Sequence, residues 1–508
     1  MHLIHRCQRG FTTITLMGTL LVGGLLVAGS FAAVDPDIGF TAKDEDSKQA
    51  YGAAEAGLAY YMNRLGLDTS YYVKCTNVTP PAGPGTSPVY QVWNGTTPAT
   101  DPRVPRAIPG YNAGYAIELL PAPGYTACQE GVQESMIDTT TGAFRIRSTG
   151  FAGKRKRSIV ATLRRKSFID YLYFTEYETS DPATYDTNQQ DWASDNCVEY
   201  RALRNSACRE IRFITQDDIR GPLHTNDSAL ICGTPTFGST TSDAIELNGV
   251  SPGWEADNGC GGSSPDFDGT LVHPGGILPM PPSNTELKNA ALAGGSTYNG
   301  ETTIVFTSSG GMTVNGVSRA LPANGVIYVS STAVCPGYSL EQNYGAQAGC
   351  GNVRVSGTYN SDITIGADND IIVMNDFRRG ATGALAGLVA NNFVRVYHPV
   401  DDRDDGDCDN DGGPGGITIE AAILALNHSF IVDNWYCGND LGTLTVYGAI
   451  AQRFRGPVGT GSGGNVSTGY AKDYNYNPRL KYREPPFFID PVQSPWRINR
   501  QNEQVPAR

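Results

Sequence analysis

A run of 24 residues without a charged side chain, residues 11–34, constrains this chain more than any other feature. As an α-helix this run would be about 36 Å long, which is enough to cross a membrane. Arg6 and Arg9 precede the run and acidic residues follow it, so the positive-inside rule predicts a cytoplasmic N-terminus and an external remainder. A cleaved secretory signal is the alternative, because Ser30, Phe31 and Ala32 form a small-x-small site.

An amphipathic helix is predicted beyond this run. Thr41 and Asp44 have the spacing of a capping box, apolar residues then recur at helical spacing, and Gly66 supplies a stop. One face carries small residues that let another helix or a sheet approach closely. The residues predicted to pack there are Ala50, Ala53, Ala54, Gly57 and Leu58.

Two segments of this region resemble type IV pilin-like proteins. Residues 9–13 (RGFTT) resemble the class III signal of that family, and residues 49–58 (QAYGAAEAGL) are similar to the start of the soluble helix in minor pilins of the PilX type and related pseudopilins. The resemblance implies that a prepilin peptidase cuts after Gly10, that Phe11 becomes an N-methylated first residue, and that Cys7 leaves with the leader. It also implies other pilins or pseudopilins as partners.

The chain departs from the family at one position. Major pilins carry a Glu at the fifth mature position, where this chain has Thr15. The Glu can meet the N-terminal ammonium of a neighbouring subunit inside the apolar filament core, where an unpaired charge is costly. Its absence indicates a minor, tip or priming component and disfavours a bulk subunit.

Residues 67–166 change to a strand pattern. Residues 115–120 alternate, and residues 142–150 and 157–164 form a predicted hairpin around Gly153 and Lys154. A helix on a small antiparallel sheet is the pilin head arrangement, so residues 35–166 are predicted to form one domain. Nine basic residues cluster on this hairpin, either as solvated outward positions or as a docking surface for an acidic neighbour. They are Arg145, Arg147, Lys154, Arg155, Lys156, Arg157, Arg164, Arg165 and Lys166.

A large β-rich domain is predicted over residues 167–469. The chain holds 60 Gly and 31 Pro among 508 residues and only 18% charged residues, a composition that favours turns and short strands. β-Branched strands recur, and the first three, which start at residues 353, 363 and 371, have the rhythm of a parallel β-helix or a sandwich. Residues 470–508, rich in aromatic residues and Pro, are predicted to form an extended strap over this domain.

The eleven cysteines lack the C-x-x-C spacing of zinc sites. Apart from Cys7 they form an even set, whose spacing suggests nearest-neighbour disulfides in an oxidising compartment. Free buried thiols are the alternative. The predicted pairs are Cys75 with Cys128, Cys197 with Cys208, Cys232 with Cys260, Cys335 with Cys350, and Cys408 with Cys437.

An acidic loop supplies the one metal candidate. Asp407, Asp409 and Asp411 followed by Gly412 fit D-x-D-x-D-G, in which alternate oxygens converge on a calcium ion; Asp405 is a further ligand candidate. The twelfth loop position is Thr418 and not the expected Glu. The alternative is a solvated acidic loop that is restrained by Cys408.

Signatures of enzymes are poor. Gly459, Gly461 and Gly464 satisfy G-x-G-x-x-G but open no predicted helix, and the G-x-S-x-G of residues 249–253 places Pro252 where a backbone N–H is needed. His224 is predicted to be a buried hydrogen-bonding residue. The net charge of −13 disfavours nucleic acid as a partner. No catalytic residue is therefore assigned.

The sequence thus predicts a membrane-inserted, exported pilin-like protein, assembled at low copy into or at the tip of a pilus or secretion filament. Its β-rich domain would serve adhesion or assembly, with a surface or glycan ligand that the sequence does not name. The alternatives are an anchored surface-binding protein that does not polymerise and a glycan-active β-helix enzyme.

Overall fold

The chain divides into two compact units in this computed structural model. Unit 1 comprises Met1–Asp138, Ala143–Arg164 and Trp496–Arg508, and unit 2 comprises Thr139–Gly142 and Arg165–Pro495. The residues that the structure describes are 43–68, 71–75, 92–93, 106–126, 128–138, 143–257, 259–401, 408–462, 465–481, 483–491 and 496–507. Among them, no helix combines the length and the apolar character that crossing a membrane requires. The run of residues 11–34 lies outside them.

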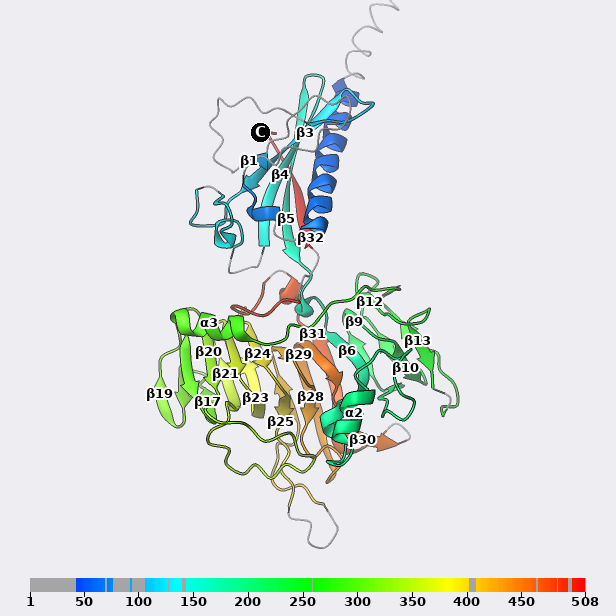
Figure 1. The fold of residues 1–508 in the computed structure, drawn as a ribbon, viewed down its shortest axis with the longest axis vertical. Helices are drawn as coiled ribbons and strands as arrows, with labels where there is room; N and C mark the ends of the chain where they lie inside the picture. Colours follow the sequence, from blue (N-terminus) through cyan, green and yellow to red (C-terminus); the bar gives the residue numbers. More distant parts are fainter. Residues whose placement is uncertain are drawn as a thin grey trace, which may run out of the picture. The chain divides into compact units, whose positions relative to one another are not determined.

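Unit 1 is a helix packed on a mainly antiparallel sheet (Figure 1). The helix is described over residues 43–67, and two short 3-10 helices follow, η1 (Tyr71–Val73) and η2 (Gln133–Ser135). The strands are β1 (Val92–Trp93), β2 (Arg106–Ala107), β3 (Ala113–Leu120), β4 (Ala143–Ala152), β5 (Arg155–Arg165) and β32 (Trp496–Gln504). They lie in the order β1-β3-β4-β5-β32, with β2 also on β3.

The edge strand β32 comes from the C-terminal end of the chain. It pairs with β5, so the whole of unit 2 is inserted between two neighbouring strands of one sheet. Trp496 anchors β32 in the core, with its ring centroid 4.8 Å from that of Phe144 and 5.1 Å from that of Tyr72. The prediction of one strap over residues 470–508 is therefore wrong in part, because a strand that completes a distant sheet leaves no local trace in the sequence.

Unit 2 is built from parallel strands that stack in successive coils (Figure 1). Face 1 contains β16 (Ser296–Asn299), β20 (Val326–Ser330), β22 (Ile363–Ala367), β24 (Ala386–Ala390), β27 (Ala422–Ala425), β29 (Asp440–Arg455), β6 (Tyr173–Ser180), β9 (Leu223–Thr225), β12 (Ala244–Glu246) and β15 (Thr270–Val272), in this order. This is the strand arrangement of a parallel β-helix, whereas a sandwich is built from antiparallel strands.

Two further faces close each coil. Face 2 contains β17 (Thr302–Phe306), β21 (Val353–Tyr359), β23 (Ile371–Arg379), β26 (Ile417–Ile419), the first half of β29, β31 (Asn465–Tyr476), β8 (Asp218–Arg220), β11 (Thr236–Phe237) and β14 (Asp266–Phe267). Face 3 contains the first halves of β21 and β23, then β25 (Val394–Val396) and β28 (Phe430–Val432), and a separate sheet of β7 (Phe213–Ile214), β10 (Ala229–Cys232) and β13 (Trp254–Ala256).

The remaining elements of unit 2 decorate these coils. The antiparallel strands β18 (Met312–Val314) and β19 (Val317–Arg319) extend β17, and β30 (Gly459–Ser462) forms a hairpin with β31. The helices are η3 (Phe168–Asp170), η4 (Pro182–Thr184), α2 (Gln190–Asn196), α3 (Thr285–Gly294) and η5 (Pro478–Lys481).

The strands of unit 2 begin and end at the middle of the stack. The chain begins with β6, winds outward to β15, continues at the opposite end with β16, and winds back to β29, which pairs with β6. The Tyr476 hydroxyl at the end of β31 donates to the Ile169 carbonyl of η3 at 2.8 Å, so the entering and leaving segments lie side by side. After β31 the chain continues over the coils of β22 and β24, where the Thr364 hydroxyl donates to the Pro486 carbonyl at 2.5 Å.

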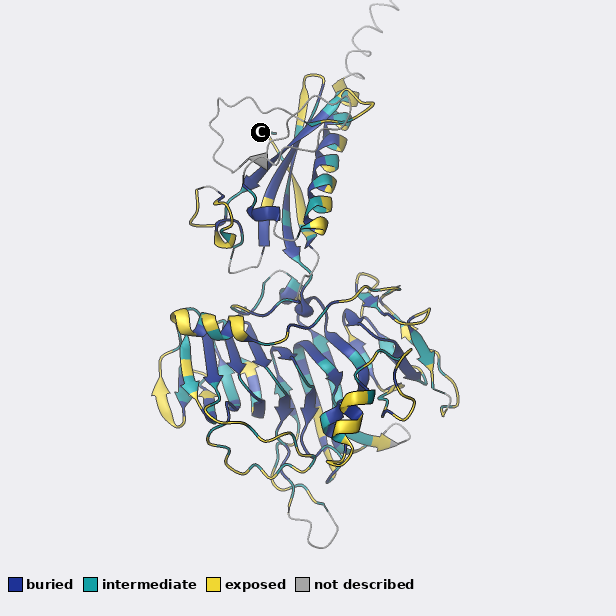
Figure 2. Ribbon diagram, viewed as in Figure 1, coloured by how far each residue is buried: buried dark blue, intermediate teal, exposed yellow. Residues whose placement is uncertain are grey.

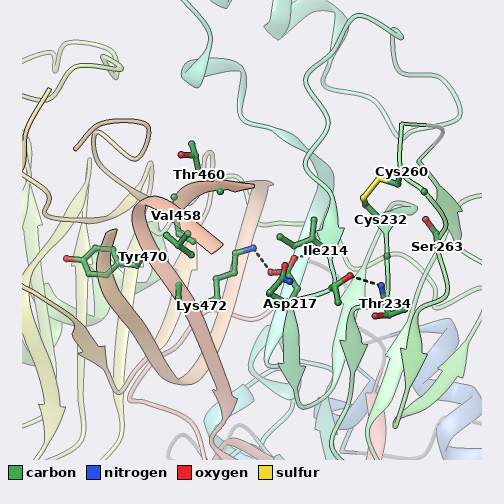
Figure 3. Close-up of a pocket in the computed structure, with 18 of the residues that line it drawn as sticks. Ile214, Asp217, Cys232, Thr234, Cys260, Ser263, Val458, Thr460, Tyr470 and Lys472 are labelled. Carbon is green, nitrogen blue, oxygen red and sulfur yellow. Dashed lines mark hydrogen bonds and ion pairs between the residues drawn. A yellow bond between two sulfur atoms is a disulfide. The ribbon is translucent and has the colours of Figure 1, made fainter. Parts of the chain in front are cut away.

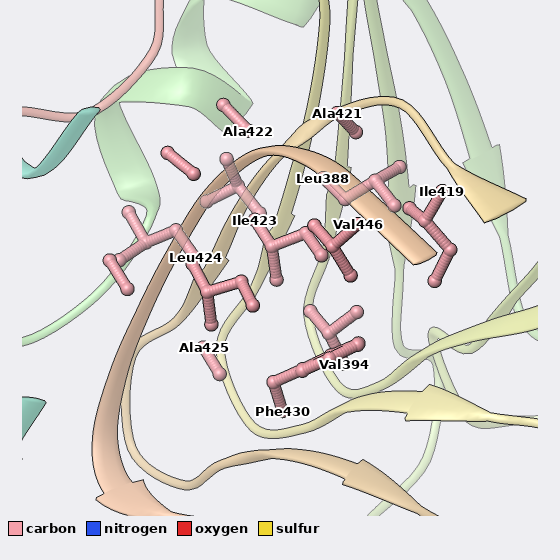
Figure 4. Packing of buried hydrophobic residues seen from close by; sticks show 14 of the residues in the cluster. Leu388, Val394, Ile419, Ala421, Ala422, Ile423, Leu424, Ala425, Phe430 and Val446 are labelled. Atoms are coloured by element: carbon pink, nitrogen blue, oxygen red, sulfur yellow. The ribbon is translucent and has the colours of Figure 1, made fainter. Parts of the chain in front are cut away.

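The interior of the stack is an apolar column. Leu388, Val394, Ile419, Ile423 and Val446 come from all three faces and are fully or almost fully buried (Figures 2 and 4). Each strand has a neighbour in the coils above and below, so backbone hydrogen bonds and side-chain stacking repeat along the axis. After β31, Leu480, Phe488 and Ile489, which belong to the strap predicted over residues 470–508, join this cluster.

Candidate functional site

The small-residue face of the first helix lies against β3 and β4. Ala50, Ala53 and Ala54 are at most 1% exposed, and the Ser148 hydroxyl donates to the Ala54 carbonyl at 2.7 Å. A Cβ on Gly150 would stand 1.9 Å from the Ala50 carbonyl oxygen and 2.4 Å from the Ala54 nitrogen. The helix and the sheet thus approach so closely that neither surface has room for a larger side chain.

Several predicted residues fall outside the described part of the chain. These are the processing residues Gly10 and Phe11 and the metal candidates Asp405 and Asp407. Asp409 and Asp411 are exposed, and the backbone N–H of Asp409 donates to the Asp401 carboxylate at 3.0 Å. Among the described residues, no group of three or more His, Cys, Asp or Glu side chains is placed to hold a metal. The calcium site stays a prediction.

Four of the five predicted cysteine pairs are disulfides in the structure: Cys75–Cys128, Cys197–Cys208, Cys232–Cys260 and Cys408–Cys437. The fifth prediction differs, because Cys335 and Cys350 are free thiols here. They are neighbours, and burial together with a hydrogen bond to Cys335 raises the pKa of the Cys350 thiol to about 12. A thiol with a raised pKa is mainly protonated near neutral pH.

The basic cluster of the predicted hairpin is divided among different environments. Arg147 is nearly buried and pairs with Glu118, and Arg157 pairs with Glu503 of β32. Lys154, Arg155 and Lys156 are exposed. Part of this cluster therefore holds the sheet together and part of it faces solvent.

His224 lies fully buried in unit 2, where it was predicted to be a hydrogen-bonding residue. Its Nδ1 lies 2.7 Å from the Glu246 carboxylate and its Nε2 lies 3.0 Å from the Asn226 side-chain oxygen. Lys166 and the Tyr171 hydroxyl also contact this carboxylate, at 2.5 and 2.8 Å. The network fastens the entering segment to β9 and β12.

A cavity of unit 2, about 970 Å³, lies where face 3 is interrupted. Faces 1 and 2 continue across the middle of the stack, but among the described residues no strand pair joins β28 to β7. Val458 and Thr460 line the cavity on one side of the interruption, and Ile214 and Thr215 line it on the other (Figure 3). Segments of several successive coils therefore share one hollow.

An ion pair between the half-buried Lys472 and the buried Asp217 forms part of the wall. The Lys472 ammonium lies 2.8 Å from the Asp217 carboxylate, as Figure 3 shows, and the Arg455 guanidinium lies 3.6 Å from it. Burial opposes ionisation of Asp217, but Lys472 and Arg455 outweigh burial and lower the pKa of this carboxyl below its usual value. Asp217 also accepts the Ile214 backbone N–H at 3.0 Å, which fixes the turn between β7 and β8.

Two further contacts hold the opposite wall. The Cys232–Cys260 disulfide ties the end of β10 to the loop after β13, and the Thr234 backbone N–H donates to the Thr215 hydroxyl at 3.2 Å. Gly233 has a φ of +84°, and a Cβ there would stand 2.2 Å from the Thr215 hydroxyl oxygen. Only glycine therefore fits this close approach between neighbouring coils.

The cavity has the chemistry of a binding site. Its charged lining residues are Asp217 and Lys472, which neutralise each other, and Asp440, which accepts the Gly442 backbone N–H at 2.7 Å. Hydroxyl groups and glycine backbone make up much of the remaining wall. The sequence did not predict Thr215, Thr234, Ser263 and Ser264 as site residues, although they lie in the loops after β7, β10 and β13, at the ends of successive coils.

Comparisons with known proteins give a structural likeness. No protein-family model matches the chain, and no curated protein matches it. The crystal structure of the competence-associated pilin ComZ from Thermus thermophilus matches over 90% of this chain and 97% of that chain, with 14% identical residues and a TM-score of 0.25. Because these values are low, the function proposed below rests on the residues of this chain.

Proposed function

We propose that this chain is an exported, pilin-like subunit that displays unit 2 on a type IV pilus or a related secretion filament. The observation that carries the proposal is the helix of residues 43–67, seated by its small residues on a mainly antiparallel sheet and preceded in the sequence by the charge-free run of residues 11–34. An apolar run long enough to cross a membrane, followed by an amphipathic helix, suits a subunit held by its N-terminus.

The insertion of unit 2 supports a display role. Both of its connections lead to neighbouring strands of unit 1, β5 and β32, and the first and last strands of unit 2, β6 and β31, both lie at the middle of the stack. The N-terminal helix is not interrupted by the insertion, so it is available for assembly. Four disulfides agree with an extracytoplasmic location.

The chemistry of unit 2 favours binding over catalysis. In the cavity at the interruption of face 3, Asp217 and Lys472 are paired with each other, and the wall offers hydroxyl groups and backbone. We therefore propose adhesion or assembly as the task of unit 2. Position 15 carries Thr where major pilins carry Glu, which supports a component present at low copy, such as one at the tip.

The mature N-terminus tests the proposal. The full chain is produced in cells that contain a prepilin peptidase, and the N-terminal peptide is analysed by mass spectrometry. We expect a start at Phe11 with a methylated amine, and we expect the Gly10→Leu variant to keep its leader. Gly24→Ala, inside the apolar run, is the matched control and should be processed normally.

Co-purification with filaments then distinguishes a subunit that polymerises from a protein that is only anchored in the membrane. Filaments sheared from the cell surface should contain the processed chain and should lack Gly10→Leu. A processed chain that stays entirely in the membrane fraction would favour an anchored binding protein. A start near Ala33 would contradict the pilin-like function altogether, because the apolar run would then be a removed signal.

A further inference from the structure

A second hollow of unit 2, about 580 Å³, lies next to the hairpin of β30 and β31. Trp435 and Tyr436 form its aromatic wall, with ring centroids 5.4 Å apart and ring planes at 76°. Both residues are half-buried. The hairpin separates this hollow from the larger cavity, because the Thr468 hydroxyl donates to the Trp435 carbonyl at 2.7 Å while Thr460 lines the larger cavity.

Polar side chains surround these rings. Asp186 and Glu341 supply carboxylate acceptors, Arg209 supplies a cationic donor, and Thr187 and Ser339 supply hydroxyl groups. All five of these residues are exposed. Concave sites of roughly 300–1,000 Å³ with an apolar floor and a few convergent polar groups are typical of small-ligand sites.

The hollow is held in shape by covalent and hydrogen bonds that lie next to its lining residues. Arg209 directly follows Cys208 of one disulfide, and Tyr436 directly precedes Cys437 of another. The Gln342 backbone N–H donates to the Asn434 side chain at 2.9 Å, and Asn434 donates back to the Gln342 carbonyl at 3.0 Å. These bonds fix the wall of residues 339–341 against Trp435, so little order has to be gained on binding.

The polar groups can change partners at little cost. Arg209 and Asp186 form an ion pair at 3.4 Å, with side chains 46% and 62% exposed. Ion pairs with this exposure contribute little to stability, so a ligand hydroxyl could replace either partner. The Arg209 guanidinium also lies over the Tyr185 ring, 4.5 Å from its centroid, which keeps it at the rim.

We propose that this hollow binds a neutral saccharide. A sugar ring presents a flat C–H face, which packs on an aromatic ring, and a rim of hydroxyl groups, which donate to carboxylates and accept from guanidinium and hydroxyl donors. The charge of unit 2 excludes an acidic polymer, because this unit contains 38 Asp and Glu against 20 Lys and Arg. Saccharide binding goes beyond the filament role and does not depend on it.

The experiment measures oligosaccharide binding by the full chain in detergent. Isothermal titration calorimetry is carried out with chitotetraose, cellotetraose and mannotetraose, and with tetragalacturonate as the acidic comparison. We expect saturable binding of at least one neutral tetrasaccharide and none of tetragalacturonate. Trp435→Ala should weaken this binding about tenfold or more, and Glu341→Gln should weaken it severalfold.

Trp254→Ala is the matched control, since Trp254 is also a half-buried Trp packed against the core of unit 2 but does not line the hollow. It should bind as the parent does. If Trp435→Ala fails to fold by circular dichroism, Tyr436→Ala and Glu341→Gln replace it. The proposal is overturned if no neutral tetrasaccharide binds, if tetragalacturonate binds more tightly, or if folded variants of the hollow bind as well as the parent does.

Discussion

Unit 1 and unit 2 bury their cores by different means. In unit 1 one helix rests on one sheet, and the closest contacts involve a few small residues and an edge strand that arrives after the whole of unit 2. In unit 2 each coil packs on the next coil in a similar way, around an apolar column. Because stability in a stack of repeats is spread over many similar interfaces, single substitutions should harm unit 1 more sharply than unit 2.

Removing the anchor of β32 should give the largest effect. Trp496→Ala deletes a ring that packs against Tyr72 and Phe144, and we expect unit 1 to lose about 3–5 kcal/mol of unfolding free energy. Calorimetry should show the transition of unit 1 shifting while that of unit 2 stays in place. Ile498→Ala, on an exposed position of the same strand, is the control. A parallel shift of both transitions would show that the units do not unfold separately.

The second largest effect should come from placing a larger side chain between the helix and the sheet of unit 1. At Gly150 even a Cβ would lie 1.9 Å from the Ala50 carbonyl oxygen. We therefore expect Gly150→Leu to lower the unfolding free energy of unit 1 by about 3 kcal/mol or more. Gly52→Ala on the exposed side of the same helix meets no atom within 4 Å, and we expect it to stabilise by up to about 1 kcal/mol. Both are measured by urea unfolding followed by circular dichroism. Equal effects of the two variants would contradict the close approach.

The same comparison explains which features the sequence predicts. The helix and the β4–β5 hairpin follow from short-range patterns: the apolar spacing that ends at Gly66, and the turn at Gly153. Three of the four disulfides likewise join cysteines that are 11 to 29 residues apart. Strands such as Ile363–Ala367 follow from β-branched runs between turn residues. Each of these features is decided by residues that are near neighbours in the sequence.

The long-range features could not be predicted in this way. Nothing around Trp496 indicates that it pairs with β5, and nothing around Tyr173 indicates that it lies beside Ile450 at the middle of the stack. The hollow next to the hairpin of β30 and β31 shares this property, because its lining residues Arg209, Glu341 and Trp435 come from three separate loops. Such sites form only when coils stack, so their residues carry no common local pattern.

A fifth disulfide would strengthen unit 2. Cys335 and Cys350 are neighbouring thiols, and an oxidant such as oxidised glutathione can accept the two electrons released when they join. For a loop of this length we expect about 3 kcal/mol of stabilisation, and none in the Cys335→Ser variant. Thiol labelling before and after oxidation, followed by calorimetry, checks this. Two thiols that resist oxidation in the folded chain would contradict it.

The smallest effect should appear on acidification, in the network that fastens the entering segment to unit 2. Burial opposes ionisation of Glu246, but hydrogen bonds and charge from His224 and Lys166 outweigh it and lower the pKa of this carboxyl from 4.5 to about 2. Because the folded pKa lies below the unfolded one, this stabilisation is complete above about pH 5 and is lost as the pH falls toward 2. The shift corresponds to at most about 3 kcal/mol. Glu246→Gln should remove that part of the acid sensitivity of unit 2, as measured by thermal unfolding between pH 2 and 7, whereas Glu286→Gln on the exposed surface of α3 should retain it. If the Glu246→Gln variant lost as much stability as the parent between pH 5 and pH 2, the acid sensitivity of unit 2 would lie elsewhere in the stack, and the network at His224 would serve packing alone.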